Sequence, residues 1–164
     1  MENTITEGFE LREIPGKGEG VFATKEFTAG ETVMVGKIKE VLEKNDSHAS
    51  QIDENTHVRH AGIVPKVNHS CSPNCGIKVN ETGAHDFVAR QDIAIGEEIT
   101  FDYVMRNYSI EHFPEQCQCG ALECRGQVTG WKDLPQNKKE EYRDFVAPYL
   151  LRMDTKKAYQ NDLN

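Results

Sequence analysis

Long hydrophobic runs are absent from this sequence, and no stretch approaches the roughly 20 apolar residues that a helix needs to span a bilayer. The first residues, Met1-Glu2-Asn3-Thr4, have neither the basic region nor the apolar core of a secretory signal. These two absences predict an intracellular soluble protein, cytoplasmic by default, with the nucleus as the alternative if the source is eukaryotic.

Positive charge is also in short supply. The 164 residues include 19 Lys and Arg against 27 Asp and Glu, for a formal net charge of −8. A general nucleic-acid-binding protein needs a basic face to displace counterions from phosphates, so direct nucleic-acid binding is not expected. The acidic chain suits a partner that is itself basic, or no charged partner at all.

A disulfide framework is not expected either, because the five cysteines are an odd number in a chain without a secretory signal. Cys117, Cys119 and Cys124 follow the spacing C-x-C-x4-C, which packing alone does not readily explain. Three thiolates leave a tetrahedral zinc one ligand short, and Cys71 and Cys75 are the remaining cysteines. We expect a structural Cys₄ zinc site, with free thiols or a redox pair as the alternatives.

Short strands separated by turns dominate the first two-thirds of the chain. β-branched or alternating runs predict strands at residues 9–14, 21–24, 32–41, 77–80, 86–91 and 98–103. Turn-forming composition predicts loops at residues 15–20, 45–54 and 68–74.

Beyond Cys124 the pattern becomes that of a helix. An apolar stripe at helical spacing is made by Tyr142, Phe145, Val146, Tyr149 and Leu150. We expect one C-terminal helix within residues 131–153, capped by Asp133, with Pro135 near its first turn and Pro148 kinking or ending it. The polar tail at residues 154–164 is expected to fray.

Three further segments contain residue types that could carry chemistry. PGKGEG at residues 15–20 has alternate glycines, which allow a backbone to approach a ligand closely. NHSCSPNC at residues 68–75 combines amides, an imidazole and two thiols, and GEEITFDY at residues 96–103 ends in an aromatic cluster. Taken singly, each is compatible with a plain structural role: a flexible turn, a turn-forming loop with buried thiols, and a strand that packs in the core.

Together, and in this order, these segments and the run CQCGALECRG at residues 117–126 resemble the SET-domain lysine methyltransferases with a post-SET cysteine motif. The resemblance runs from about residue 9 to residue 128. It implies a mainly β, β-clip-like SET fold of several small sheets with a pseudoknot. The implied divisions are a SET domain at residues 9–115, a post-SET zinc segment at 116–130, a helix at 131–153 packed on the same domain, and the tail at 154–164.

The resemblance also implies roles for individual residues. Tyr103 would be catalytic in methyl transfer from S-adenosylmethionine to the side-chain amine of a lysine, and Phe101 would line the lysine channel. The substrate would be a basic Lys-containing protein, such as a histone tail or a ribosomal segment. The implied ligands of a structural zinc are Cys71, Cys117, Cys119 and Cys124. The implied cofactor-binding residues are Lys17, Gly18, Glu19, Gly20, Asn68, His69 and Val128.

The chain departs from the family pattern upstream of the catalytic residue. No tyrosine occurs between Phe9 and Tyr103, where larger members often supply one to the channel. The side chains that could fill this space are Phe22, Phe27, His48 and His57. The departure leaves open a catalytically weak or inactive SET-fold zinc module that binds basic peptides. A thiol redox protein using Cys117 and Cys119 is a third hypothesis.

Overall fold

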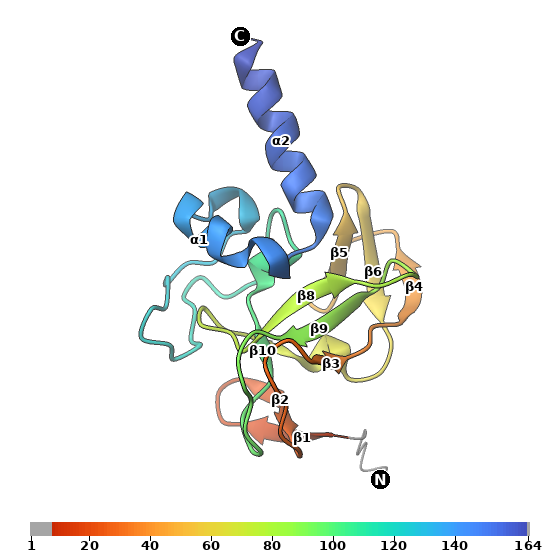
Figure 1. Cartoon of the computed structure of the whole chain (residues 1–164), viewed down its shortest axis with the longest axis vertical. Coiled ribbons are helices and arrows are strands. Elements are labelled where there is room, and N and C mark those ends of the chain that lie inside the picture. Colours follow the sequence, from red (N-terminus) through yellow and green to blue (C-terminus); the bar gives the residue numbers. More distant parts are fainter. Residues whose placement is uncertain (1–7, 164) are drawn as a thin grey trace.

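The computed structural model describes residues 8–163, which form short strands, short 3₁₀ turns and two α-helices (Figure 1). The strands are β1 Phe9–Ile14, β2 Gly18–Ala23, β3 Thr32–Met34, β4 Ile38–Leu42, β5 Ser50–Asp53, β6 Thr56–His60, β7 Asn68–His69, β8 Cys75–Val79, β9 His85–Ala89 and β10 Thr100–Phe101. The helices are α1 Gln136–Tyr142 and α2 Pro148–Asp162. The 3₁₀ turns are Val64–Lys66, Tyr103–Met105, Trp131–Asp133 and Arg143–Phe145.

The strands form four small sheets. β1 and β2 make an antiparallel hairpin, β3-β9-β8 and β4-β6-β5 are three-stranded antiparallel sheets, and β7 pairs with β10 in parallel. The hairpin lies at the end of the molecule opposite α2, with the three-stranded sheets between them (Figure 1). The predicted mainly β architecture of several small sheets is confirmed.

Residues 97–101 run through the middle of this arrangement. The Ala23 N–H donates to the carbonyl of Glu97, and the Ile99 N–H donates to the carbonyl of Val21, so β2 holds one edge of the segment. β7 holds the other edge, with Asn68 in register with Thr100. The chain therefore delivers the residues that follow β10 to the place where β2 and β7 meet.

Two strand predictions need correction. Residues 32–41 form two strands instead of one, because the backbone at Gly36 packs so closely on His85 that a Cβ atom would lie 2.0 Å from the His85 carbonyl oxygen. Residues 45–54, expected to be a loop, contain β5, which pairs with β6. Because β5 and β6 contain mostly polar residues, the sequence shows no apolar strand pattern at either of them.

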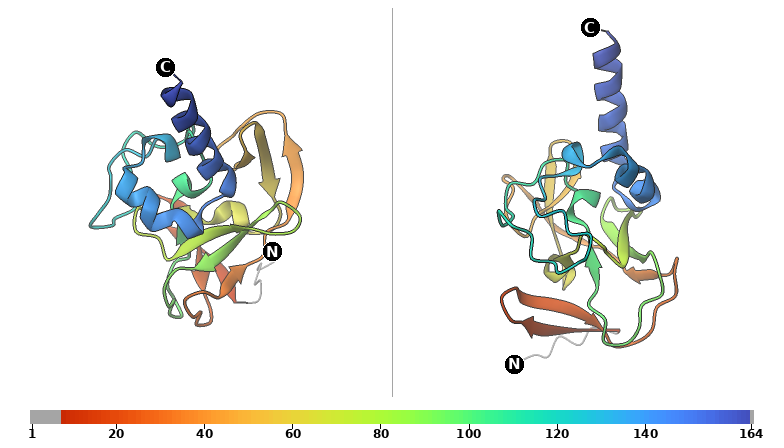
Figure 2. Two further views of the ribbon diagram at one scale, coloured as in Figure 1. Left: turned by 45° about the horizontal axis from the view of Figure 1, so that its top comes forward. Right: turned by 90° about the vertical axis from the view of Figure 1, so that its left-hand side faces the viewer.

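The single C-terminal helix is also corrected. α1 ends at Tyr142, Ala147 is extended, and Pro148 begins α2. Proline restricts the residue before it to extended conformations and is favoured in the first turn of a helix, so it separates the two helices here. Asp133 lies in a 3₁₀ turn and does not cap α1, whose N-cap is Pro135. The tail expected to fray is helical through Asp162 and projects from the body in α2 (Figure 2).

Two buried histidines lie between the three-stranded sheets, on β6 and β9. The His85 N–H donates to His60 Nε2 at 3.0 Å, so the proton of His60 is on Nδ1, which donates to Ser50 Oγ at 2.9 Å. Burial lowers the pKa of His60 to about 4 and lowers that of His85 well below its ordinary value. Both rings are therefore neutral at pH 7.

This pair predicts a loss of stability in mild acid. Between about pH 6.5 and pH 4 the unfolded chain binds the protons that the folded histidines refuse, so the free energy of unfolding falls as the pH falls. His60 alone accounts for on the order of 3 kcal/mol by pH 4. Urea titrations across this window measure the effect. His60→Gln should flatten the pH dependence relative to wild type, whereas the exposed His112→Gln should not, and equal slopes in all three proteins would contradict the prediction.

Candidate active site and metal centre

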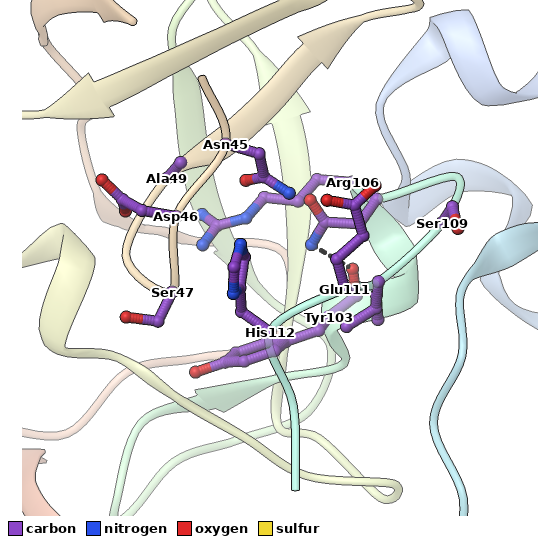
Figure 3. A pocket seen from close by; sticks show the side chains of 11 residues that line it. Asn45, Asp46, Ser47, Ala49, Tyr103, Arg106, Ser109, Glu111 and His112 are labelled. Carbon is purple, nitrogen blue, oxygen red and sulfur yellow. Dashed lines mark hydrogen bonds between the residues drawn. The ribbon is translucent and has the colours of Figure 1, made fainter.

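Tyr103 begins the 3₁₀ turn after β10 and lies in the wall of two separate cavities. The larger has a volume of about 400 Å³, and its lining includes Lys17, Asn68 and His69. The smaller has a volume of about 30 Å³, and side chains enter it from residues 45–49 and from residues 106–112 (Figure 3). The half-buried side chain of Tyr103 is therefore placed where the two cavities approach each other.

The glycine-rich turn between β1 and β2 packs directly on the larger cavity. Gly16 and Lys17 line it, while Gly20 lies under Asn68 and Glu98. A Cβ atom at Gly20 would lie 2.8 Å from Glu98 Oε2 and 3.2 Å from Asn68 Nδ2, so this position has no room for a side chain. Asn68 Nδ2 donates to the carbonyl of Glu19 at 2.9 Å and to Glu98 Oε2 at 3.0 Å. The amide thus fastens the turn to the core, and both of its N–H groups are used within the chain.

The buried imidazole of His69 links the tyrosine to the cysteine cluster. The Tyr103 N–H donates to His69 Nδ1 at 3.1 Å, so the ring proton resides on Nε2, which lies 3.3 Å from Cys71 Sγ. Burial lowers the pKa of His69 to about 4, and the neutral ring can therefore donate to a thiolate without adding charge. Phe113 packs edge-on against both His69 and Tyr103, at ring-centroid distances of 5.2 and 5.8 Å.

Asp102, which is fully buried, joins three parts of the chain. Its carboxylate accepts from Arg125 in a bidentate pair at 2.6 and 2.9 Å, and from the Tyr142 hydroxyl at 3.0 Å. The Val104 N–H also donates to it, so Asp102 caps the 3₁₀ turn that carries Tyr103. Burial lowers the pKa of Arg125, but the Asp102 carboxylate outweighs burial and raises it above its ordinary value. This network holds the cysteine segment and α1 against the site.

Four of the five cysteines converge beside this network. The Sγ atoms of Cys71, Cys117, Cys119 and Cys124 all lie within 4.8 Å of one another, and those of Cys71 and Cys117 are 4.0 Å apart. Zinc–sulfur bonds of about 2.3 Å place the sulfurs of a tetrahedral site about 3.8 Å apart, so the four thiols fit this metal. The Arg125 N–H lies 3.5 Å from Cys71 Sγ and can stabilise a thiolate there. Cys75 is buried away from the group, and burial raises the pKa of its thiol to about 12.

Several residues predicted for the site lie elsewhere. Gly18, Glu19 and Gly20 belong to β2 and do not line the larger cavity, whereas Gly16, which was not among the predicted cofactor-binding residues, does. Val128 and Phe101 are buried in the core and line neither cavity, so their roles as adenine cover and channel wall stay predictions.

Of the four side chains that could fill the space of the missing tyrosine, only His48 reaches a cavity. Phe27 is buried in a stack with Phe9, and Phe22 lies under the Arg12 guanidinium. His57 lines neither cavity. His112, which no motif indicated, lines both of them beside Tyr103 (Figure 3).

Sequence reasoning also missed Asp102, Arg106 and Phe113. Asp102 lies inside the motif TFDY, but its role depends on Arg125 and Tyr142, which are 23 and 40 residues away. Phe113 closely precedes the cysteine cluster, and its aromatic side chain at that position was the one sequence signal that could have placed it at the site. Nothing in the sequence distinguishes Arg106 from an exposed arginine.

The fold and the site together define the class of protein. The family model described as SET domain matches residues 18–104, just over half of the chain, from β2 through the 3₁₀ turn that carries Tyr103. The chain belongs to the SET-domain family.

Three relatives with curated names align over about half of the chain or less. A "Histone-lysine N-methyltransferase, H3 lysine-4 specific" of Saccharomyces cerevisiae is 35% identical over 49% of this chain and 8% of its own length. A protein with the same description from Chaetomium globosum is 38% identical over 49% of this chain and 8% of its length. An H3 lysine-36 specific enzyme of Mycosarcoma maydis is 36% identical over 39% of this chain and 7% of its length. The chain therefore spans less than a tenth of the length of each of these three relatives.

A solved structure shares the fold over a larger part of the chain. The crystal structure of KRYPTONITE in complex with mCHH DNA, H3(1-15) peptide and SAH superposes with a TM-score of 0.56 at 26% identity, covering 73% of this chain and 29% of that one.

Among residues 8–163, neither α-helix has the length and apolar character needed to cross a bilayer.

Proposed function

We propose that this chain transfers a methyl group from S-adenosylmethionine to the side-chain amine of a lysine in a basic protein segment. The observation that carries the proposal is the position of Tyr103, which forms part of the wall of both cavities. A cofactor in the larger cavity and a lysine entering through the smaller one would meet at a single hydroxyl group. The names of the relatives, and the H3 peptide and SAH in the solved neighbour, support the same activity.

The larger cavity fits the cofactor in size and in polarity. Its volume of about 400 Å³ falls within the roughly 300–1,000 Å³ of small-molecule sites. Both protons of the Asn68 amide are engaged within the chain, and its oxygen is left as an acceptor suited to the ammonium group of an amino acid. When bound, S-adenosylmethionine supplies a methyl group that its sulfonium makes electrophilic. We assign Lys17, Asn68 and His69 to the holding of this ligand.

The side chains around Tyr103 would orient the nucleophile. A free lysine has a pKa near 10.4 and is almost wholly charged at pH 7, so the reactive neutral amine must be favoured in the site. A narrow pocket disfavours the ammonium form by desolvation. Burial raises the pKa of Tyr103, so its hydroxyl stays protonated and can orient the amine by a hydrogen bond. Alignment of this kind is worth about 7–11 kcal/mol of the barrier in well-oriented reactions.

The cysteine cluster would act through architecture alone. Cys71, Cys117, Cys119 and Cys124 would hold a structural zinc, which would tie the segment after residue 116 to the loop after β7. Cys117 and Cys119 also line the larger cavity, so this tie would complete one wall of the cofactor site.

A histone tail is the substrate class that we favour. The net charge of −8 and the carboxylate of Glu111 at the smaller pocket suit a Lys-rich peptide. An H3 substrate would also require this protein to reach chromatin, and hence the nucleus in a eukaryotic cell.

The second function is a SET-fold module that binds basic peptides without modifying them. The lack of any tyrosine between Phe9 and Tyr103 favours it, because no upstream phenol hydroxyl is available to the lysine. Binding of S-adenosylmethionine and peptide with no methyl transfer to any lysine would identify this module.

Methyl transfer from labelled S-adenosylmethionine tests the proposal. The purified protein is incubated with H3 tail peptides and, in parallel, with a whole-cell extract, and mass spectrometry identifies the labelled residue. We expect label on a lysine flanked by other basic residues. Label on no lysine in either sample would refute the methyltransferase assignment.

We expect the degree of methylation to depend on Phe101. Its ring packs on Tyr103 at a centroid distance of 5.0 Å and presents no hydroxyl that could hold a water against the amine. We therefore expect products beyond monomethyl-lysine, and Phe101→Tyr should shift them toward monomethyl without abolishing the first transfer. Product masses after long incubation measure this. Phe87→Tyr, which adds a hydroxyl to the neighbouring ring at 4.9 Å, is the control for a core perturbation. Exclusively monomethyl product from wild type would contradict the prediction.

A further inference from the structure

Arg106 is a buried cation that lacks a counter-ion among residues 8–163. Its residue is 5% exposed, and its guanidinium Nε and Nη1 atoms have no hydrogen-bond partner among the described residues. Arg125 provides the contrast, because its guanidinium makes a bidentate pair with Asp102. An unpaired buried charge costs several kcal/mol of stability unless something offsets it. The position of Arg106 therefore calls for a function.

The groups around Arg106 do not neutralise it. From β6 and β9 it faces His60 and His85, from the preceding 3₁₀ turn Tyr103, and from α2 Tyr149, all of them neutral at pH 7. The titratable side chains that share the smaller pocket with it are Tyr103, Asp46, Glu111 and His112. Asp46 is already paired with Arg59, and the Arg106 guanidinium forms no ion pair with a carboxylate of residues 8–163. Burial lowers the pKa of Arg106 to about 10, so it keeps its charge at pH 7.

The guanidinium is close to the point where a lysine nitrogen would react. Its central carbon lies 4.5 Å from the centroid of the Phe101 ring, and that ring packs on Tyr103 at 5.0 Å. Arg106 and Tyr103 line the same small pocket (Figure 3). The positive charge of Arg106 in this pocket disfavours a second positive charge nearby. It therefore opposes an ammonium group at Tyr103 and leaves a neutral amine unaffected.

We propose that Arg106 is a positioning residue that admits the substrate lysine to the reacting position only as the neutral amine. This inference rests on the proposed methyltransferase activity. The ammonium group releases its proton to solvent water as it enters. The nitrogen lone pair then forms the N–C bond to the methyl group while the S–C bond breaks, and the sulfur keeps that electron pair. Glu111 at the exposed side of the pocket attracts the charged lysine, and Arg106 at the buried side rejects the charge.

Arg106→Met tests the proposal, because it removes the charge and keeps a long apolar side chain. The measurement is kcat against pH at saturating peptide and cofactor, since kcat reports ionisations of the bound complex. The acidic limb of the kcat profile should move to higher pH by about one unit, because the bound ammonium is no longer disfavoured. Relative to wild type, kcat should be about tenfold lower at pH 7 and nearly equal above pH 10. KM for the peptide should fall at pH 7, because the ammonium form is no longer rejected. Arg106→Lys, which retains a charge, should keep the wild-type limb.

Controls separate this role from a structural one. Arg90→Met removes another arginine that stacks on rings, at 4.9 Å from the Tyr142 centroid, but Arg90 is paired with Glu141 and lies outside both pockets. It should leave the pH limb in place. Arg106→Met should also raise the melting temperature, since an uncompensated charge is lost.

Titrating the substrate lysine bound to the wild-type protein tests the proposal without depending on the folding of any variant. In the complex with SAH, the ε-carbon resonance of a ¹³C-labelled lysine in the bound peptide should report a pKa below the free value of about 10.4. An unshifted value, or an unchanged kcat limb in Arg106→Met, would overturn the assignment to Arg106 while leaving the methyltransferase proposal intact. Failure of the wild type to methylate any lysine would overturn the methyltransferase proposal, and Arg106 with it.

Discussion

Replacing Tyr103 with phenylalanine should lower kcat by at least about a hundredfold while the protein keeps its fold, its metal and its affinity for S-adenosylmethionine. The change removes one hydroxyl at the junction of the two cavities. That hydroxyl has little structural importance, because its one contact with the described chain is a long 3.5 Å approach to the Val67 carbonyl. The loss should therefore appear in the chemical step, where the hydroxyl orients the amine.

Single-turnover rates and cofactor binding by calorimetry distinguish these effects. Tyr108→Phe is the matched control: Tyr108 is a half-buried aromatic on the same segment that lines neither cavity. A wild-type rate in Tyr103→Phe would show that Tyr103 does not have the assigned role. A loss of cofactor affinity equal to the loss of rate would assign it to binding instead.

The second large effect is expected from Cys71→Ala, which should release zinc and disorder the segment that carries the other three ligands. Cys71 is the one cysteine of the cluster that belongs to the SET core, so its sulfur would connect the metal to the loop after β7. Because the folding of small metal sites is coupled to the binding of the metal, losing this ligand should cost several kcal/mol of local stability. The hydrogen bond from the Tyr142 hydroxyl to the buried Asp102 lies outside that segment, so it should remain and keep α1 attached.

Metal analysis and hydrogen exchange of residues 116–130 measure the result. Cys75→Ala is the control, since it deletes an equally buried thiol outside the cluster and should retain one zinc per chain. Full zinc occupancy in Cys71→Ala, with loss in Cys75→Ala, would reverse the ligand assignment. Metal-free wild-type protein with ordered residues 116–130 would contradict the zinc centre itself.

Local sequence was sufficient to predict the elements whose form depends on near neighbours. β1 lies where its alternating residues place it, and the predicted strands at residues 77–80 and 86–91 correspond closely to β8 and β9. The apolar stripe of the C-terminal region is largely buried, although it is divided among α1, the 3₁₀ turn Arg143–Phe145 with the extended link after it, and α2. The proposed zinc ligands were predictable in type, because clustered thiols are typical of a structural metal site, but their fourth member was chosen by family resemblance.

Contacts between distant residues were beyond the sequence. Asp102 meets Arg125 and Tyr142, and the imidazole of His69 contacts both the Tyr103 backbone and Cys71, because the sheets bring these segments together. The charge of a side chain does not indicate which distant residue it will pair with.

By itself, the sequence determined the glycine turn, the thiol cluster and the tyrosine after β10, because each depends on residue types at short spacing. The class of fold followed from the family resemblance that these motifs carry together. Only the tertiary structure decided which side chains surround that tyrosine. Arg106 is an ordinary basic residue in the sequence, and its burial without a counter-ion among the described residues arises from β6, β9 and α2 closing around it. Whether a side chain is charged, paired or desolvated depends on what packs against it, and that is a property of the folded chain.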